Sequence, residues 1–392
     1  KQKTAYEIRL SLVGSEMCIR DSTPAVPEIE MPANAVTSRV AEAFYWLGRY
    51  LERAWCISHM IGTIEALETE EFNSAERKLF RPVWNRVLPP LESAGAPGTK
   101  GRRSISTWLD RYRLTLQPDE RGSVANTLQR AFANADSLQD VISPEAWAAL
   151  ADLRSRFGRS KFRPEGAEAF CIRETRRLCE AVTRLVPMFV GSGEATMLAD
   201  DGWRFCVAGQ SFERAVVTVN ALSAFSNALS GHLDAGPGTE VGSEIELSAF
   251  LRLLGTRDAY RRVYQMRAAP AEVIEILIRH PGAPRSVARC LGLCRRMLAE
   301  AFADTVEPPA CVAIDLLLRQ ISGRDFREWL GARGPQELLL PDETRDRANS
   351  LGEVLRRLLK ETLDVHLRIT DSFAGNRERI GRTRHLGRSH AV

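Results

Sequence analysis

Apolar residues recur at helical spacing along most of the chain from Ser38 onward. Between Ser38 and Leu67 they follow the i, i+3, i+4, i+7 spacing of a helix with one buried face, as at Phe44, Leu47 and Leu51. The same criterion predicts helices at about 72–88, 105–116, 121–140, 144–157, 165–189, 200–229, 243–254, 257–267, 270–279, 285–304, 309–319, 324–331 and 342–373. No segment shows the alternation of a β-strand, so we expect an all-α fold, a helical bundle.

Helix starts and loops divide this pattern. Ser38 is the expected N-cap of the first helix, and Ser143 followed by Pro144 and an acid predicts another start. Glycine- and proline-rich loops are expected at 91–104 and 230–242.

The two ends of the chain differ from the rest. Residues 1–22 fit no helical pattern, and Val13–Ser22 resembles a translated sequencing adapter. Charged residues interrupt any apolar core that a signal peptide would need there. With the proline-containing linker at 23–35, we expect an artefact-like, disordered segment over 1–35, and a protein that begins near Val36. A basic tail covers 376–392.

Two stretches of the chain match each other. Residues 44–54 and 205–215 share Phe, Gly, Glu, Arg and Ala at a constant offset of 161. This internal repeat predicts two related helical halves, about 36–190 and 191–375, within one domain over 36–375.

The repeated motif places a glycine one turn before a glutamate. Glycine inside a helix is unfavourable by about 1 kcal/mol, and close helix approach is a common reason for it. We therefore expect the two helices to meet at Gly48 and Gly209, which brings Glu52 and Glu213 together. The arginines that follow them, Arg53 and Arg214, and Arg49 one turn earlier would lie nearby.

Two interpretations of the glutamates follow. Glu52 and Glu213 could form a catalytic carboxylate pair for acid–base work or metal binding. Alternatively, each is a buried partner for an arginine of another helix, which we favour because a buried carboxylate needs a partner. The chain has no Glu-x-x-His motif, and we expect no metal; a ligand set of Glu52, Cys56 and His59 is not repeated in the second half.

Composition narrows the function classes. The net charge of +4 is too small to indicate nucleic-acid binding. Of the 54 basic residues all but six are arginine, which fits either abundant Arg–Glu pairs or a GC-rich genome. The eight cysteines include no C-x-x-C pair and predict small buried residues in a reducing cytoplasm. No apolar run is long enough to span a membrane.

Five blocks, in order, resemble the bacterial alpha-E family. The first is Ser38-Arg39-Val40-Ala41-Glu42 with Tyr45 to Ala54, and the second runs from Ala133 to Trp147. The others begin at Gly202, Tyr260 and Pro284, so the resemblance spans about Ser38 to Phe373. One departure is Gln210, where the family usually has arginine.

The resemblance implies an all-helical protein associated with circularly permuted ATP-grasp ligases and transglutaminase-like peptidases. Association with these enzymes suggests that the family acts in systems that make or cleave amide bonds on peptides. The expected partner is therefore an ATP-grasp ligase or a transglutaminase-like protein. The leading hypothesis is an accessory or binding partner of an ATP-grasp amide ligase system. The alternatives are a stand-alone enzyme that uses the paired glutamates, and a purely structural scaffold.

Further basic residues lie beside hydroxyl groups near helix starts, where they could hold a carboxylate or phosphate, cap helices or pair with glutamates. The binding candidates are Arg49, Arg53, Arg214, Tyr260, Arg261, Arg262, Arg285 and Ser286. An anionic peptide is the expected ligand. The chain has no glycine-rich phosphate loop, and no cofactor, nucleic acid or membrane partner is expected.

Overall fold

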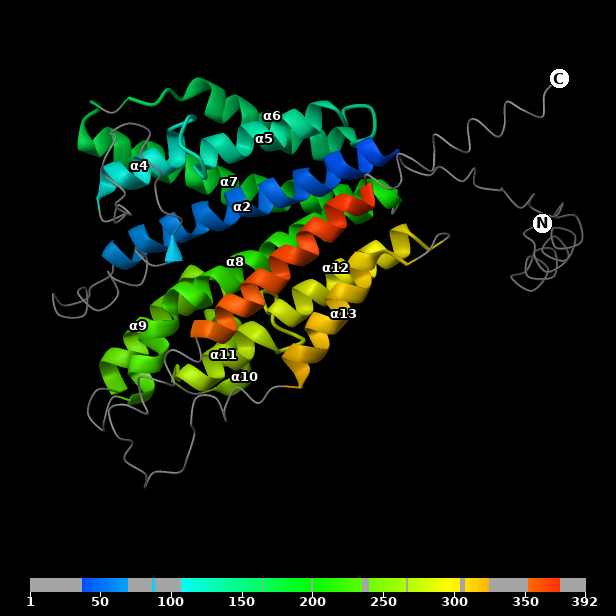
Figure 1. Cartoon of the computed structure of the whole chain (residues 1–392). Coiled ribbons are helices and arrows are strands. Elements are labelled where there is room, and N and C mark those ends of the chain that lie inside the picture. The colour runs from blue at the N-terminus through cyan, green and yellow to red at the C-terminus, as the bar shows by residue number, and fades with distance from the viewer. Residues whose placement is uncertain are drawn as a thin grey trace, which may run out of the picture. The chain divides into compact units, whose positions relative to one another are not determined.

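Long helices cross at the centre of the computed structural model, which describes residues 37–69, 87–88, 107–163, 165–198, 200–234, 240–265, 267–303, 307–323 and 352–373. The helices are α2 (Ser38–Thr69), α4 (Trp108–Leu116), α5 (Val124–Asp136), α6 (Pro144–Arg159), α7 (Glu168–Thr196), α8 (Asp201–Asp234), α9 (Glu240–Leu253), α10 (Arg257–Tyr264), α11 (Pro270–Ile278), α12 (Val287–Ala301), α13 (Pro309–Ser322) and a C-terminal helix over 352–373 (Figure 1). The described residues contain no strand, which confirms the all-α prediction.

The helices gather around α2 and α8. Helices α5 and α7 pack on α2, and α4 and α6 pack on α7. Helices α11 and α12 pack on α8, and α13 packs on α12 (Figure 1). The chain passes from the first set to the second between the end of α7 at Thr196 and the start of α8 at Asp201.

Burial explains why α2 and α8 take the central positions. Phe44, Leu47 and Leu51 of α2 are almost fully buried, as the apolar spacing predicts. Helix α8 is apolar on several sides, with Phe205, Phe212 and many smaller apolar side chains buried. A helix that is hydrophobic around most of its circumference needs neighbours on several sides, and α8 has α2, α11 and α12.

Side-chain caps fix several helix starts. The Ser143 hydroxyl accepts a hydrogen bond from the Ala146 amide at 3.3 Å, and Pro144 follows, as expected. At α2 the expectation is wrong by one residue. Ser38 lies within the first turn, and the Thr37 hydroxyl accepts from the Val40 amide at 3.4 Å.

Some expected elements differ in length or lie outside the described residues. Helix α8 continues to Asp234 and α9 begins at Glu240, so both ends of the loop expected at 230–242 are helical, and residues 235–239 lie outside the described residues. Helix α7 runs through Pro187 to Thr196. The helix expected at 72–88 lies almost entirely outside the described residues, as do the helix at 324–331, the 91–104 loop and both ends of the chain.

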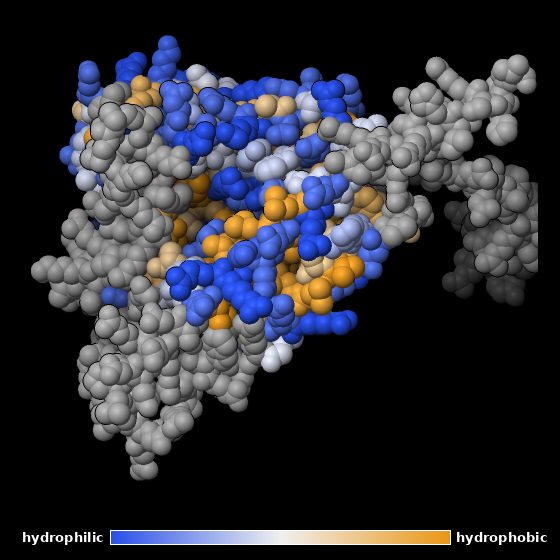
Figure 2. Space-filling model, in the orientation of Figure 1, coloured by the Kyte–Doolittle hydropathy of each residue, from blue (hydrophilic) through white to orange (hydrophobic). Residues whose placement is uncertain are grey.

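Figure 2 shows mostly hydrophilic residues over α5 and α6 and hydrophobic residues over the C-terminal helix and α13. The exposed apolar side chains on those two helices are Val312, Leu316, Leu363 and Leu367. In the described part of the chain, no helix combines the length and apolar character needed to cross a membrane.

Candidate functional site

Helices α2 and α8 touch through backbone at two glycines. A Cβ atom on Gly48 would collide with the carbonyl group of Cys206, and one on Gly209 would collide with the carbonyl group of Tyr45. Both positions therefore exclude any side chain. Tyr45 and Cys206 are themselves separated by the repeat offset of 161, so each glycine meets the repeat-equivalent residue of the other helix.

Glu213 of α8 is held by two arginines of α2. Arg49 Nε donates to Glu213 Oε2 at 2.8 Å, and its Nη2 lies 2.7 Å from the same oxygen. Arg53 Nε donates to Glu213 Oε1 at 2.6 Å. Both carboxylate oxygens of this 2% exposed residue are thus paired with cations.

Glu52 of α2 has the reciprocal arrangement. Arg214 binds it through two bonds, Nε to Oε1 at 2.9 Å and Nη2 to Oε2 at 2.8 Å. Arg285, in the loop before α12, donates from Nη2 to Glu52 Oε1 at 3.1 Å. Its guanidinium also lies over the Trp55 ring, 4.5 Å from the ring centroid.

The two glutamates differ in the origin of their second arginine. Arg49 supplies it for Glu213, and the repeat-equivalent position of Arg49 is Gln210. Arg285 supplies it for Glu52 from a different part of the chain. Each helix thus supplies arginine to the glutamate of the other helix. A duplicated helix pair would give this reciprocal pattern, and the duplication itself stays a prediction.

The electrostatics of this cluster keep both carboxyl groups ionised. Burial raises the pKa of Glu52, but the charges of Arg214 and Arg285 outweigh burial and bring the pKa down to about 2. In the same way, burial raises the pKa of Glu213, and the charges of Arg53 and Arg49 lower it to a net value below its ordinary one. A general base needs a pKa near the working pH and access to its substrate, and this arrangement supplies neither to Glu52 or Glu213.

Cys56 and His59 do not join Glu52 as ligands of a metal site. The Cys56 thiol lies 3.5 Å from Glu52 Oε1 and accepts from Arg285 Nη1 at 3.3 Å, and burial raises its pKa to about 12. The His59 ring stacks on Trp55, and its Nε2 donates to the Arg252 carbonyl at 3.1 Å. Nowhere in the described residues do three His, Cys, Asp or Glu side chains form a group that could hold a metal ion.

The remaining binding candidates lie away from the glutamates. The buried Tyr260 hydroxyl donates to the Arg267 carbonyl at 2.9 Å and accepts from the Ala269 amide at 3.1 Å, so it orders the loop after α10. Arg261 and Arg262 are exposed on α10. Ser286 is the N-cap of α12. Of the eight binding candidates, the structure brings Arg49, Arg53, Arg214 and Arg285 to the glutamates.

The outer face of the same α2 segment lines a cleft of about 430 Å³, which we call the arginine cleft. Its lining residues are Trp46, Arg49, Tyr50, Arg53, Arg121, Gly122, Asn126, Thr127, Arg130 and His366. The four α2 residues follow i, i+3, i+4, i+7 spacing, so one face of this part of α2 presents two aromatic rings and two guanidinium groups.

The arginine cleft is strongly basic. Four arginines line it, no acidic residue does, and Glu213 offsets one of the two inner charges. Arg53 uses only Nε for Glu213, and its terminal nitrogens make no hydrogen bond to a described residue. Neither Arg121 nor Arg130 has an ion-pair partner among the described residues, and both are exposed. Such unpaired guanidinium groups are suited to bind a carboxylate or phosphate.

His366 of the C-terminal helix closes one side of this cleft. Arg49 Nη1 donates to the imidazole, 2.9 Å from Nδ1 and 3.0 Å from Nε2, which requires a neutral ring. Burial and then the charge of Arg49 lower the pKa of His366 to about 4. The ring also stacks on Tyr45, with centroids 6.0 Å apart.

Sequence reasoning missed Trp46, Tyr50, Arg121, Arg130 and His366. The spacing of Trp46 and Tyr50 with Arg49 and Arg53 contained a signal for a shared face. Arg121, Arg130 and His366 come from other segments, and no local pattern connects them with α2.

Comparison with protein families gives one match. The model of the Alpha-E family, described as a predicted alpha-helical domain with a conserved ER motif, matches residues 36–373. The chain belongs to the Alpha-E family. No curated protein and no solved structure matches it. Two of its Glu-Arg dipeptides, Glu52-Arg53 on α2 and Glu213-Arg214 on α8, are the ones that exchange ion pairs between the two central helices of this Alpha-E chain.

Proposed function

We propose that this Alpha-E chain is an accessory binding module whose arginine cleft holds the carboxylate end of a peptide or of a partner segment. The observation that carries the proposal is the lining of the cleft, with four arginines, a neutral histidine and no acid. Arginine binds carboxylates through two parallel hydrogen bonds, and the rings of Trp46 and Tyr50 offer a surface for the rest of the ligand.

In this proposal the glutamates are structural. Glu52 and Glu213 anchor α2 against α8, and Glu213 fixes the side chains of Arg49 and Arg53 at the inner wall of the cleft. Arg121 and Arg130 supply charge from outside the cluster. The buried ion pairs of Glu52 and Glu213 support a structural role over a catalytic carboxylate pair. The arginine cleft supports ligand binding over a purely structural scaffold, which would need no such cleft.

The proposed partner is an ATP-grasp amide ligase, or a transglutaminase-like protein of the same system. A ligase that joins amino groups to carboxyl groups has substrates and products that end in a carboxylate, which is the group that the arginine cleft suits. The identity of the partner rests on the family resemblance.

Calorimetric titration tests the binding site. An N-acetylated dipeptide with a free carboxylate should bind about tenfold or more tightly than its C-terminal amide, because charge-assisted hydrogen bonds are lost with the charge. Arg121→Ala and Arg130→Ala should each weaken binding of the dipeptide that has a free carboxylate and leave binding of its amide unchanged. Both residues are exposed and outside the ion-pair cluster, so the fold should persist.

The matched control is Arg184→Ala, which removes an exposed arginine of α7 outside the cleft and should leave binding unchanged. Equal binding of the acid and the amide, or wild-type affinity in both cleft variants, would overturn the proposed site.

Co-expression of the chain with an ATP-grasp amide ligase, followed by size-exclusion chromatography, tests the proposed partner. Co-elution that is lost with Arg121→Ala and Arg130→Ala together is the expected result. Separate elution at micromolar concentration would refute a stable complex.

A further inference from the structure

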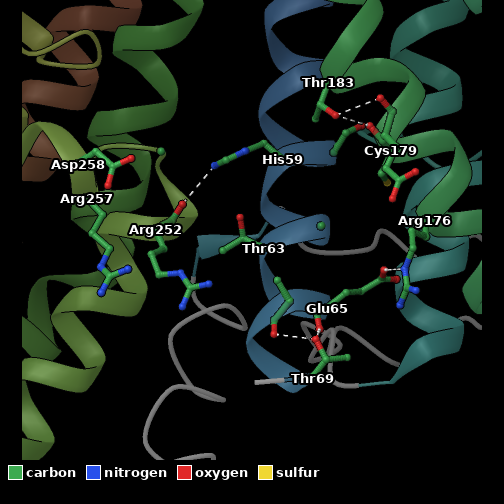
Figure 3. Close-up of a pocket in the computed structure, with 15 residues that line it drawn as sticks. His59, Thr63, Glu65, Thr69, Arg176, Cys179, Thr183, Arg252, Arg257 and Asp258 are labelled. Carbon is green, nitrogen blue, oxygen red and sulfur yellow. Dashed lines mark hydrogen bonds and ion pairs between the residues drawn. The ribbon is translucent and has the colours of Figure 1, made fainter. Parts of the chain in front are cut away.

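A second cleft, of about 690 Å³, lies at the C-terminal part of α2, and we call it the mixed-charge cleft. Gly62 and Ala66 of α2 form its floor, α7 lines one side, and the α9–α10 corner lines the other. Figure 3 shows Arg252 and Arg257 extending from the α9–α10 side, Glu65 and Arg176 on the opposite side, and Thr63 between them. The volume falls in the range of about 300–1,000 Å³ that is usual for ligand pockets.

The charges in this lining balance. Its arginines are Arg176, Arg252 and Arg257, and its carboxylates are Glu65, Glu180 and Asp258. The arginine cleft has no acid in its lining, so the two clefts are built for different ligands. The α9–α10 side has two arginines and one carboxylate, and the α2–α7 side has one arginine and two carboxylates, so the two sides have opposite net charge and favour a ligand with both signs.

Several polar groups in the lining are already committed. Arg176 Nε donates to Glu65 Oε2 at 3.2 Å. The hydroxyls of Thr69 and Thr183 donate to carbonyl groups of their own helices. His59 is bound to the Arg252 carbonyl. These groups shape the cleft and have little capacity left for a ligand.

Other groups remain available on both sides. The guanidinium of Arg257 and the carboxylates of Glu180 and Asp258 make no hydrogen bond or ion pair with any residue that the structure describes, and the same is true of the Thr63 hydroxyl. Arg257 and Asp258 lie on the α9–α10 side, where Arg252 adds a second cation, and Glu180 lies on the α7 side. The two sides therefore present opposite net charge to the cleft, and Thr63 lies between them.

The separation of the walls sets the length of the ligand. Packed helices lie about 8–10 Å apart, so two helices that flank α2 are separated by at most about 16–20 Å. An extended chain rises about 3.3–3.6 Å per residue, so a peptide of no more than about five residues fits between the two sides.

We propose that the mixed-charge cleft binds a short zwitterionic peptide, with its free carboxylate at Arg257 and its free amino group at Glu180. The small floor residues Gly62 and Ala66 allow the peptide backbone to approach α2, and Thr63 offers a hydrogen bond to a peptide group. The site is independent of the arginine cleft. At 100° per residue, Gly62 and Ala66 face away from Trp46, Arg49, Tyr50 and Arg53, and they lie about 20 Å farther along α2.

The probe is tri-alanine. Calorimetric titration of the full chain compares its affinity with the affinities of N-acetyl-tri-alanine and tri-alanine amide. We expect tri-alanine to bind and each blocked form to bind about tenfold or more weakly, because each has lost one charge-assisted hydrogen bond. Equal affinity of the three peptides, or no heat of binding at millimolar concentration, would overturn the proposal.

Two variants assign the two ends. Arg257→Ala should remove the preference for the free acid over the amide and keep the preference for the free amino group. Glu180→Gln should do the reverse. Both residues lack partners among the described residues, so neither change removes a contact of the fold. Loss of both preferences in either variant, or of neither, would contradict the assignment.

The arginine cleft provides the separating control. Because tri-alanine also carries a free carboxylate that the arginine cleft can bind, the titrations with the three peptides and the Arg257 and Glu180 variants are made in the Arg121→Ala, Arg130→Ala background, where the preference for the free amino group should persist. If the double variant abolishes tri-alanine binding, the peptide is bound in the arginine cleft and the mixed-charge site is refuted. If the acetylated dipeptide fails to bind while tri-alanine binds, the proposed function fails and this inference stands.

Discussion

Replacing Glu52 by Gln tests the ion-pair cluster most directly. The change keeps the shape of the side chain and removes its charge, which leaves the buried guanidinium group of Arg285 and the partly buried one of Arg214 without this counter-charge. We expect a large loss of stability with little change in the helical content of the remaining folded protein.

The magnitude follows from the pKa of Glu52. A fall from the ordinary 4.5 to about 2 corresponds to about 3 kcal/mol, at 1.36 kcal/mol per pKa unit. Breaking a buried ion pair by removing one partner typically costs about 3–5 kcal/mol. At about 2 °C per kcal/mol for a chain larger than 200 residues, Tm should fall by roughly 6 °C.

The pH dependence gives a second check. The folded-state pKa of Glu52 is depressed, so its contribution is fully present above pH 4.5 and is lost as the pH falls toward 2. The difference in the free energy of unfolding between wild type and Glu52→Gln should therefore be constant above pH 5 and shrink below pH 4.5.

Urea unfolding followed by circular dichroism measures these differences. Glu180→Gln, an exposed change in the middle of α7, is the control and should stay within about 0.5 kcal/mol of the wild type. Adding Arg214→Gln to Glu52→Gln should destabilise the protein by less than the sum of the two single changes, because the two side chains interact directly. A loss below about 1 kcal/mol for Glu52→Gln, or additive effects, would refute the inferred role of the cluster.

Three further outcomes are expected. Gly209→Ala should destabilise the protein by several kcal/mol, because a Cβ at 209 collides with the Tyr45 carbonyl. Gly191→Ala should instead stabilise it by roughly 1 kcal/mol, because a Cβ at 191 meets open space on a helix. Urea unfolding compares the two variants, and similar effects would contradict the close contact at Gly209. The depressed pKa of His366 means that its stabilising contribution is complete above pH 6.5 and is lost as the pH falls toward 4. Amide protection factors in residues 352–373, which correct for the slower intrinsic exchange at low pH, should therefore fall over that range, and the fall should be smaller in His366→Gln. Constant protection factors in the wild type would show that protonation does not affect this helix. The seven described cysteines are buried and free, so a thiol reagent should label them in the folded protein far more slowly than in urea. Cys18 lies outside the described residues, so rapid labelling of more than one thiol per folded chain would show that the buried thiols are accessible.

The sequence was sufficient for most of the helices because burial imposes a helical period on the apolar residues. The sequence also indicated that Gly48 lies against α8 and that Glu52 lies near Arg214. When two helices that share a motif pack at its glycines, the matching residues lie at the same level along both helix axes. These inferences depend on local regularity, and they held where the regularity continued through the contact.

Other parts of the site had no such signal. Arg285 is 233 residues from Glu52, and His366 is 317 residues from Arg49. Such pairings are decided by the packing of whole helices and leave no period in the sequence. Tyr260 failed as a binding candidate for a different reason, because a hydroxyl near a helix start is as easily used by the neighbouring loop.

The place of Arg285 in the sequence has a consequence for folding. The central helix pair is complete only when a loop 233 residues beyond Glu52 supplies the second cation of that carboxylate. The loop before α12 therefore acts as a clamp on α2, and a chain that ends before residue 285 would leave Glu52 with Arg214 as its remaining ion-pair partner among the described residues.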